Sequence, residues 1–308
     1  MSITIETQST AKAVEHKRPS IGSASRRSSV YKAILAVILL VCSFAVFLLG
    51  PNYSTLFLTN GKALYASGVS AVFLIAALIF KRIDKLVKFW PITYAFFIAS
   101  MVNLVADLFG GYQDDFVRVL GTSTNTNPGA GLGKLYETLL AVIPILVLTW
   151  LSGANLRSLS LAKGNLNYKW GFGIGALFVI NYLTSVLIFF GTGYEMSKLG
   201  SVILWGLVFA FSNSLLEELW VRGLFVKKLL PLVGVVGTIL LTSIWFGAMH
   251  FLSVAYMPIT VVPIFVINTL TMGLACGILM VKTDSIWGAY LIHAAADLFL
   301  FIAMLAVH

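Results

Sequence analysis

The stretch Asn213-Ser-Leu-Leu-Glu-Glu-Leu-Trp-Val-Arg222 places three ionisable side chains, Glu217, Glu218 and Arg222, inside a long apolar segment. On insertion scales, a charged group at the centre of a bilayer costs about 2.5–3.5 kcal/mol. A membrane segment that carries three such groups so close together is therefore a candidate functional site. The remainder of the chain is then expected to be the scaffold that brings other functional groups to this stretch.

Composition indicates a polytopic membrane protein. Hydrophobic residues make up 59% of the 308 residues and charged residues 11%, whereas soluble domains have about 45–50% and 25%. Apolar runs of about 20 residues recur along the chain, so we expect an all-α transmembrane bundle of about eight or nine helices. Cys42 and Cys276 both lie in apolar runs and are expected to be small buried hydrophobic residues, not a disulfide.

The net charge of +9 does not predict a nucleic-acid-binding protein. The basic residues lie in the N-terminal tail and between apolar runs, as the positive-inside rule expects of cytoplasmic loops. No soluble basic domain is present that could bind nucleic acid. We therefore expect a multi-pass protein of the cell membrane, in contact with lipid, with a cytoplasmic N-terminus. The oligomeric state is not predicted.

Three regions are expected along the chain. Residues 1–29 form a disordered basic cytoplasmic tail, residues 30–198 the N-terminal transmembrane helices and residues 199–308 a C-terminal transmembrane core. The segment from Leu199 to Lys228 exceeds a simple span, so it is tilted or broken near Gly223 or Pro231. The apolar segments are expected at about 31–50, 63–80, 89–109, 135–153, 170–190, from 199, 234–251, 259–281 and 286–306, with a loop over 110–134.

Helical spacing gives the two adjacent glutamates different neighbours. Glu218 and Arg222 stand at positions i and i+4, within pairing distance on one face. Glu217 is rotated by about 100° from Glu218, so it faces elsewhere and is the candidate general base. The alternative is that Glu217, Glu218 and Arg222 form an inert buried ion-pair lock.

Two further apolar segments, Phe246-Gly-Ala-Met-His250 and His293-Ala-Ala-Ala-Asp297, each carry a histidine. With Glu217 they would provide nitrogen and oxygen donors for a zinc-like ion, or a cage that orients and deprotonates a water molecule. The candidate metal ligands are Glu217, His250, His293 and Asp297, and both alternatives remain open. In simple antiparallel spans Glu217 lies near mid-membrane and His250 near a helix end, so their meeting requires a bent helix or a deeper start.

These three motifs resemble the CAAX-protease and bacteriocin-processing (CPBP, or Abi) family of intramembrane proteases, which includes the type II CAAX prenyl endopeptidases. The family pattern Glu-Glu-x-x-x-Arg, Phe-x-x-x-His and His-x-x-x-Asn/Asp occurs here in order, over about residues 200–300. Gly273-x-x-x-Gly277, a spacing that lets helices approach closely, also looks like part of the family's third segment. The resemblance implies an α-helical membrane endopeptidase, of the metallo- or glutamate type, that cleaves a membrane-associated peptide or protein.

The resemblance also implies the role of each residue. Glu217 activates water, His250, His293 and Asp297 complete the water or metal site, and Glu218 and Arg222 support it. Two other hypotheses remain: a non-catalytic bacteriocin-immunity or binding protein on the same scaffold, and a proton-coupled transporter. The transporter is disfavoured because the polar groups gather in one C-terminal third and no inverted repeat is found.

Overall fold

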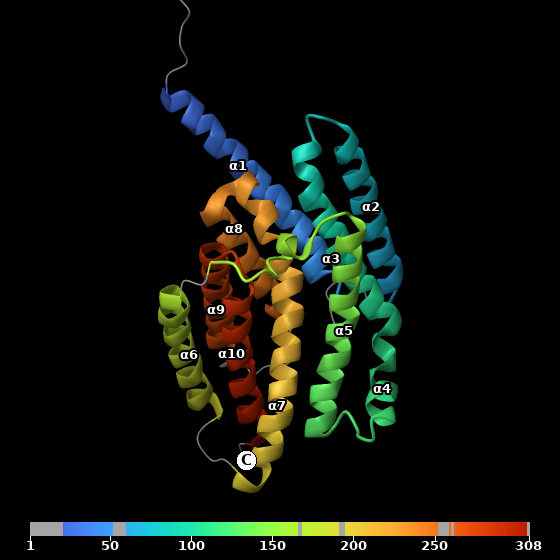
Figure 1. The fold of residues 1–308 in the computed structure, drawn as a ribbon, viewed down its shortest axis with the longest axis vertical. Helices are drawn as coiled ribbons and strands as arrows, with labels where there is room; N and C mark the ends of the chain where they lie inside the picture. Colours follow the sequence, from blue (N-terminus) through green and yellow to red (C-terminus); the bar gives the residue numbers. More distant parts are fainter. Residues whose placement is uncertain are drawn as a thin grey trace, which may run out of the picture.

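The computed structural model describes residues 21–51, 60–165, 168–190, 195–251, 259 and 262–306. All regular structure in these ranges is helical, which confirms the all-α membrane bundle (Figure 1). The helices are α1 (Ile21–Ser43), α2 (Lys62–Arg82), α3 (Trp90–Phe109), α4 (Gln113–Val119), α5 (Asn127–Leu151), α6 (Tyr168–Phe190), α7 (Met196–Glu217), α8 (Val226–Phe251), α9 (Val262–Thr283) and α10 (Trp287–Ala306). Two short π-helices, η1 (Phe44–Leu48) and η5 (Glu218–Gly223), continue α1 and α7.

Seven helical stretches in the described part of the chain are long and apolar enough to cross a membrane, and they include all or most of α2, α3, α5, α7, α8 and α9 and the part of α1 from Ser29 onward. Shorter apolar stretches in α6 and α10 bring the total to the nine expected segments. The expected loop over 110–134 is wrong in part, because it contains α4 and the first turns of α5. α1 begins at Ile21, before the expected end of the tail, whereas residues 1–20 lie outside the described residues.

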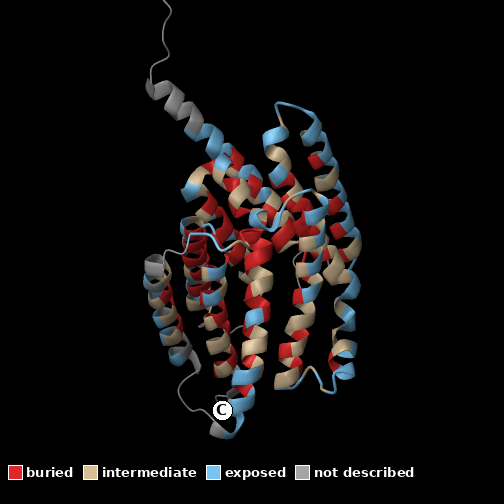
Figure 2. Cartoon of the chain, viewed as in Figure 1, coloured by how far each residue is buried: buried red, intermediate tan, exposed pale blue. Residues whose placement is uncertain are grey.

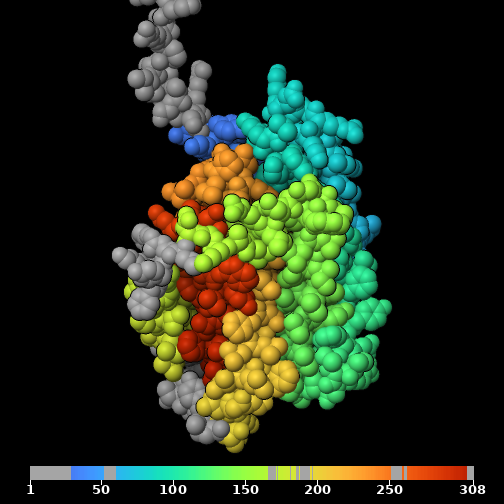
Figure 3. Space-filling model, in the orientation of Figure 1, coloured from blue at the N-terminus to red at the C-terminus, as the bar shows by residue number. Residues whose placement is uncertain are grey.

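The outer faces of the helices are apolar. Leu64, Leu177 and Trp150 are 80%, 74% and 74% exposed, and the buried residues gather where the helices meet (Figure 2). In lipid such side chains need no cover, and the helical backbone satisfies its own hydrogen bonds. Figure 3 shows α10, α7 and α5 side by side across one face, and α7 packs against both neighbours.

A break in α8 at Gly234 explains how Glu217 and His250 come to lie at the same depth in the helix bundle. Gly234 has φ 77° and ψ −179°, a backbone conformation that favours glycine, and it divides α8 into two limbs. The chain runs from Glu217 to this break and returns from it to His250 over almost equal lengths of sequence. The bent helix that the meeting of these residues requires is therefore present, and the break lies just beyond Pro231.

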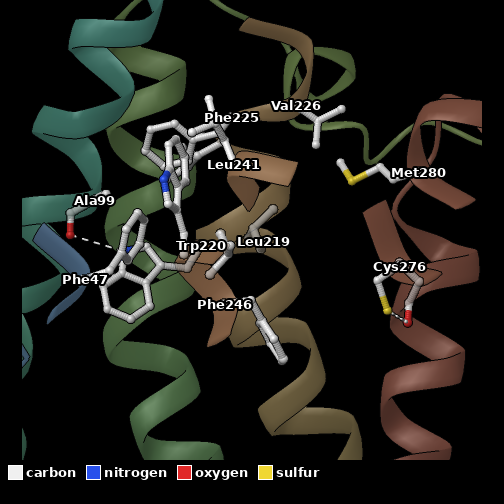
Figure 4. Packing of buried hydrophobic residues seen from close by; sticks show 14 of the residues in the cluster. Phe47, Ala99, Leu219, Trp220, Phe225, Val226, Leu241, Phe246, Cys276 and Met280 are labelled. Carbon is white, nitrogen blue, oxygen red and sulfur yellow. Dashed lines mark hydrogen bonds between the residues drawn. The ribbon is translucent and has the colours of Figure 1, made fainter. Parts of the chain in front are cut away.

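An aromatic cluster joins the N-terminal helices to the candidate site. Phe47, in η1, lies 5.1 Å from the Trp220 ring, 5.7 Å from Phe225 and 5.8 Å from Trp245, measured between ring centroids (Figure 4). Trp220 Nε1 also donates to the Ala99 carbonyl of α3 at 3.1 Å. Because Trp220 belongs to η5, η1 and α3 contact the turn that carries Glu218 and Arg222.

The backbone of α1 near η1 is held by side chains of other helices. A π-helix shifts the backbone hydrogen bonds from the α-helical pattern. Three carbonyls here accept instead from side chains: Ala45 from Tyr65 at 2.9 Å, Val46 from Asn103 at 2.7 Å and Leu49 from Lys62 at 3.1 Å. These bonds from α2 and α3 hold Phe47 in place, so residues of the first 150 help to shape the C-terminal core.

The small-residue spacing on α9 does allow a close helix contact. A Cβ atom at Gly273 would lie 2.9 Å from Ser243 Cα of α8, and one at Gly277 would lie 3.4 Å from an Ile239 side-chain atom. Gly273 is therefore required for the observed packing of α8 on α9. Cys42 and Cys276 are both free thiols, as the sequence predicts.

Candidate active site

The three polar segments predicted from sequence meet at one place, where α7 passes into η5. Glu217 is the last residue of α7, and Glu218 and Arg222 lie in η5, all of whose residues are buried. π-Turns inside helices occur often at functional sites, because they change the direction in which successive side chains point. Here the turn directs Glu217 and Glu218 toward different partners.

Glu218 and Arg222 form a fully buried ion pair. Arg222 Nη1 donates to Glu218 Oε1, both side chains have zero exposure, and Arg222 Nη2 donates to the Gly273 carbonyl at 3.4 Å. The guanidinium also lies 4.6 Å from the centroid of the Phe246 ring, a cation–π distance. The pair therefore exists as the i, i+4 spacing predicts, and it ties η5 to α8 and α9.

His293 is the second donor to Glu218. Its Nδ1 lies 2.9 Å from Glu218 Oε1, and the imidazole is 1% exposed. Glu218 is a carboxylate that already accepts from Arg222, so His293 Nδ1 carries the proton of this hydrogen bond. In a neutral His293 the other nitrogen, Nε2, is then an acceptor, and it lies 3.6 Å from Glu217 Oε2.

His250 has the same arrangement beside the same oxygen of Glu217. Its Nδ1 lies 2.9 Å from the Phe246 carbonyl, which can only accept, so Nδ1 donates. Nε2 of neutral His250 is thus also an acceptor, and it lies 3.7 Å from Glu217 Oε2. The Phe246 ring contacts both imidazoles, with centroids 4.4 Å from His250 and 5.5 Å from His293, and so fixes their separation.

With both histidines neutral, Glu217 faces two nitrogen acceptors with no hydrogen between them. Its side chain is 14% exposed, and its Oε2 atom has no hydrogen-bond partner among the described residues. A buried polar atom without a partner is uncommon. Glu217 Oε2 therefore lacks a hydrogen-bond donor, which a bound molecule could supply. A water molecule has two donor hydrogens and matches two such acceptors.

Asp297 completes the cluster beside His293. Its Oδ1 lies 3.6 Å from His293 Nε2, and its Oδ2 accepts from Asn213 Nδ2 at 3.0 Å and lies 3.1 Å from Ser214 Oγ. The three sequence motifs do not include Asn213 and Ser214, although both are polar residues in an apolar run about one turn before Glu217. That position was the signal that could have identified them.

A cavity of about 350 Å³ reaches Glu217 from the side of α3 and α5. Asn213, Leu216, Trp220 and Met249 line it beside Glu217. The two histidines are not among the residues that line it. The cavity is the size of a small-ligand site, and Glu217 is the member of the cluster that a substrate there would meet.

The proposed zinc ligands do not form a metal site in this arrangement. Zinc is held by three or four nitrogen, sulfur or oxygen donors at about 2.0–2.3 Å from a common point. The donor types of Glu217, His250, His293 and Asp297 are suitable, but no group of three or more such side chains in the described residues has a geometry that could hold an ion. The zinc site stays a prediction.

Comparison with known proteins agrees with the motifs. Residues 199–299 match the family model described as type II CAAX prenyl endopeptidase Rce1-like, a range that includes all six predicted site residues. No curated protein and no solved structure matches the chain. The matched region coincides with the helices that build the Glu217 cluster, so the C-terminal third of this chain is similar to the CAAX-protease (CPBP) family of membrane proteins.

Proposed function

We propose that this protein is an intramembrane endopeptidase that hydrolyses a peptide bond of a membrane-associated peptide or protein, with Glu217 as the general base. The observation that supports this proposal most directly is the convergence of three acceptors, Glu217 Oε2 and the Nε2 atoms of His250 and His293, within 3.6–3.7 Å. A water molecule beside these atoms donates one hydrogen to Glu217 and the other to an imidazole. A lone pair of the water oxygen is then free to attack a carbonyl carbon in the cavity.

The reaction follows ordinary general acid–base chemistry. Glu217 takes a proton as the water oxygen attacks the peptide carbonyl carbon, and a tetrahedral intermediate forms. The C–N bond then breaks, and the protonated Glu217 gives its proton to the departing amine nitrogen. The products are a carboxylic acid and an amine, and Glu217 returns to its starting state.

The other residues position these groups. Glu218, which is paired with Arg222, accepts from His293 Nδ1 and so orients that imidazole. The Phe246 carbonyl accepts from His250 Nδ1 and orients the second imidazole. Asp297, fixed by Asn213, lies where it would stabilise a positive charge on His293. Preorganised dipoles and charges of this kind act strongly in a site from which bulk water is excluded.

The test is cleavage of a peptide mixture by the full-length protein in phosphatidylcholine nanodiscs, with products identified by mass spectrometry. The mixture contains prenylated and unprenylated peptides, since the matched family is described by prenyl substrates. We expect Glu217→Gln to lower the cleavage rate by at least 10²-fold. Glu195→Gln, a change of the same chemistry at an exposed position, should leave the rate unchanged.

Two results would contradict the proposal: the absence of any cleavage by the wild type, or cleavage retained by Glu217→Gln. A cellular effect of the protein that persists in Glu217→Gln would instead favour the non-catalytic immunity or binding hypothesis.

A further inference from the structure

A second polar group lies on the wall of the cavity that reaches Glu217. Gln113 of α4 and Lys134 and Glu137 of α5 line this cavity, outside the region that matches the family model. Glu137 accepts from Lys134 Nζ at 2.5 Å and from Gln113 Nε2 at 3.2 Å. α5 packs against α7, so this group belongs to the wall that faces the helix of Glu217.

The polar side chains around the cavity include several acceptors. Three amides line it, and each donates one NH₂ hydrogen to an acceptor of the protein and keeps its amide oxygen, together with a second NH₂ hydrogen, for a ligand. These bonds run from Asn103 to the Val46 carbonyl (2.7 Å), from Gln113 to Glu137 (3.2 Å) and from Asn213 to Asp297 (3.0 Å). Trp220 Nε1, the indole donor on this wall, already has a partner, because it donates to the Ala99 carbonyl.

The charges on the wall lead to the same conclusion. Its ionisable residues are Glu137, Glu217 and Lys134, so with both carboxylates ionised the wall carries one net negative charge. Lys134 is occupied by Glu137 and by the Phe209 ring, 5.5 Å from its Nζ. The Glu137 side chain, in contrast, remains 42% exposed and accessible to a ligand.

We propose that this wall selects a basic side chain, lysine or arginine, of the peptide that the cavity binds, with Glu137 as the principal acceptor. The amide oxygens of Gln113, Asn103 and Asn213 supply further acceptors for its N–H groups. This inference deepens the proposed function, because the peptide is taken to be the substrate whose bond Glu217 cleaves. The selecting residues lie on α3, α4 and α5 as well as α7, which gives the helices outside the matched region a role in specificity.

An internal control exists on the same chain. Lys198 and Glu195 form a pair with the same i, i+3 spacing, the same 2.5 Å distance and the same 42% exposure of the glutamate. This pair does not line the cavity. If Glu137 were only one member of a surface ion pair, Glu137→Gln and Glu195→Gln would have the same effect on peptide binding.

The experiment measures peptide binding by fluorescence anisotropy, with the full-length protein in phosphatidylcholine nanodiscs. His250→Ala serves as the background, because it stops turnover and keeps both cavity carboxylates. The probes are fluorescein-labelled decapeptides that are identical except for one central residue: lysine, its neutral counterpart norleucine, or glutamate. Cleavage of the same peptides by the protein with His250 intact is measured in parallel.

We expect the lysine peptide to bind about tenfold more tightly than the norleucine peptide, as for one charge-assisted hydrogen bond. Glu137→Gln should reduce this preference to less than about threefold, and Glu195→Gln should leave it intact. Lys134→Met should strengthen the preference, because it removes the cation that competes for Glu137. Should Glu137→Gln fold poorly, the Lys134→Met result still tests the sign of the effect.

The inference is overturned if no peptide binds, if lysine gives no advantage, if the glutamate peptide binds best, or if Glu137→Gln and Glu195→Gln behave alike. Cleavage without a preference for lysine would refute this inference and leave the proposed function standing. Lysine-dependent binding without any cleavage would refute the proposed function and leave the basic-residue site standing.

Discussion

Replacement of Glu218 by glutamine should destabilise the protein, although the change is one atom in size. Glu218 is fully buried, and its Oε1 accepts from Arg222 and from His293. Without the carboxylate, Arg222 becomes a fully buried cation whose charge has no partner. Removal of one member of a buried ion pair costs about 3–5 kcal/mol, and we expect a loss of this size.

The adjacent residue provides the matched control. Glu217 is 14% exposed, and its Oε2 accepts no hydrogen bond from the described residues. Glu217→Gln should therefore change the free energy of unfolding by less than about 1 kcal/mol, while the proposed function expects it to lower the rate of hydrolysis by at least about 10²-fold. The same amide substitution at neighbouring positions thus separates the stabilising glutamate from the proposed catalytic one.

The assay is reversible unfolding of the purified protein by sodium dodecyl sulfate in mixed micelles, followed by tryptophan fluorescence and circular dichroism. The double variant Glu218→Gln with Arg222→Met should be more stable than the sum of the single changes predicts, by about 2 kcal/mol, because no unpaired charge remains. Equal destabilisation by Glu217→Gln and Glu218→Gln, or strict additivity in the double variant, would refute this account of the site.

Three further predictions concern packing and the metal. Phe47→Ala should cost about 3–5 kcal/mol of unfolding free energy in the same assay, whereas Val41→Ala, at a position 63% exposed, should cost little; equal losses would show that the aromatic cluster does not support the core. Gly273→Val should cost about 1–3 kcal/mol, since its side chain would overlap Ser243, and Gly68→Val, with open space around it, is the comparison. Chelation with 1,10-phenanthroline separates the two alternatives for the site: hydrolysis that is unchanged after chelation is the result expected of a metal-free water site, and loss of activity that zinc alone restores would establish the zinc prediction.

Much of the fold could be predicted because its signals are local. Apolar runs of about 20 residues locate helices without knowledge of their neighbours, and the nine expected segments agree with the observed helices within a few residues in most cases. The 110–134 region was the exception. α4 is short and polar, with Asp114 and Asp115 in its first turn, so hydropathy does not distinguish it from a loop.

The candidate site was predictable in its members but not in its contacts. The i, i+4 spacing correctly indicated the Glu218–Arg222 pair, which lies within one helical turn. The hydrogen bond from His293 to Glu218 and the contact of Asn213 with Asp297 join residues far apart in the sequence. Such contacts depend on which helices pack together, and helical periodicity does not specify that.

By itself, the sequence determined that this chain is a membrane bundle with three charged or histidine-bearing motifs in its C-terminal third. The high cost of a charge in lipid makes those motifs stand out from any apolar background. Only the tertiary structure decided that Gly234 turns the chain so that His250 returns to Glu217, that Phe47 of η1 supports η5, and that Lys134 and Glu137 share a cavity with the site. The physical reason is that these relations are set by packing between helices, whose partners cannot be read from any one segment.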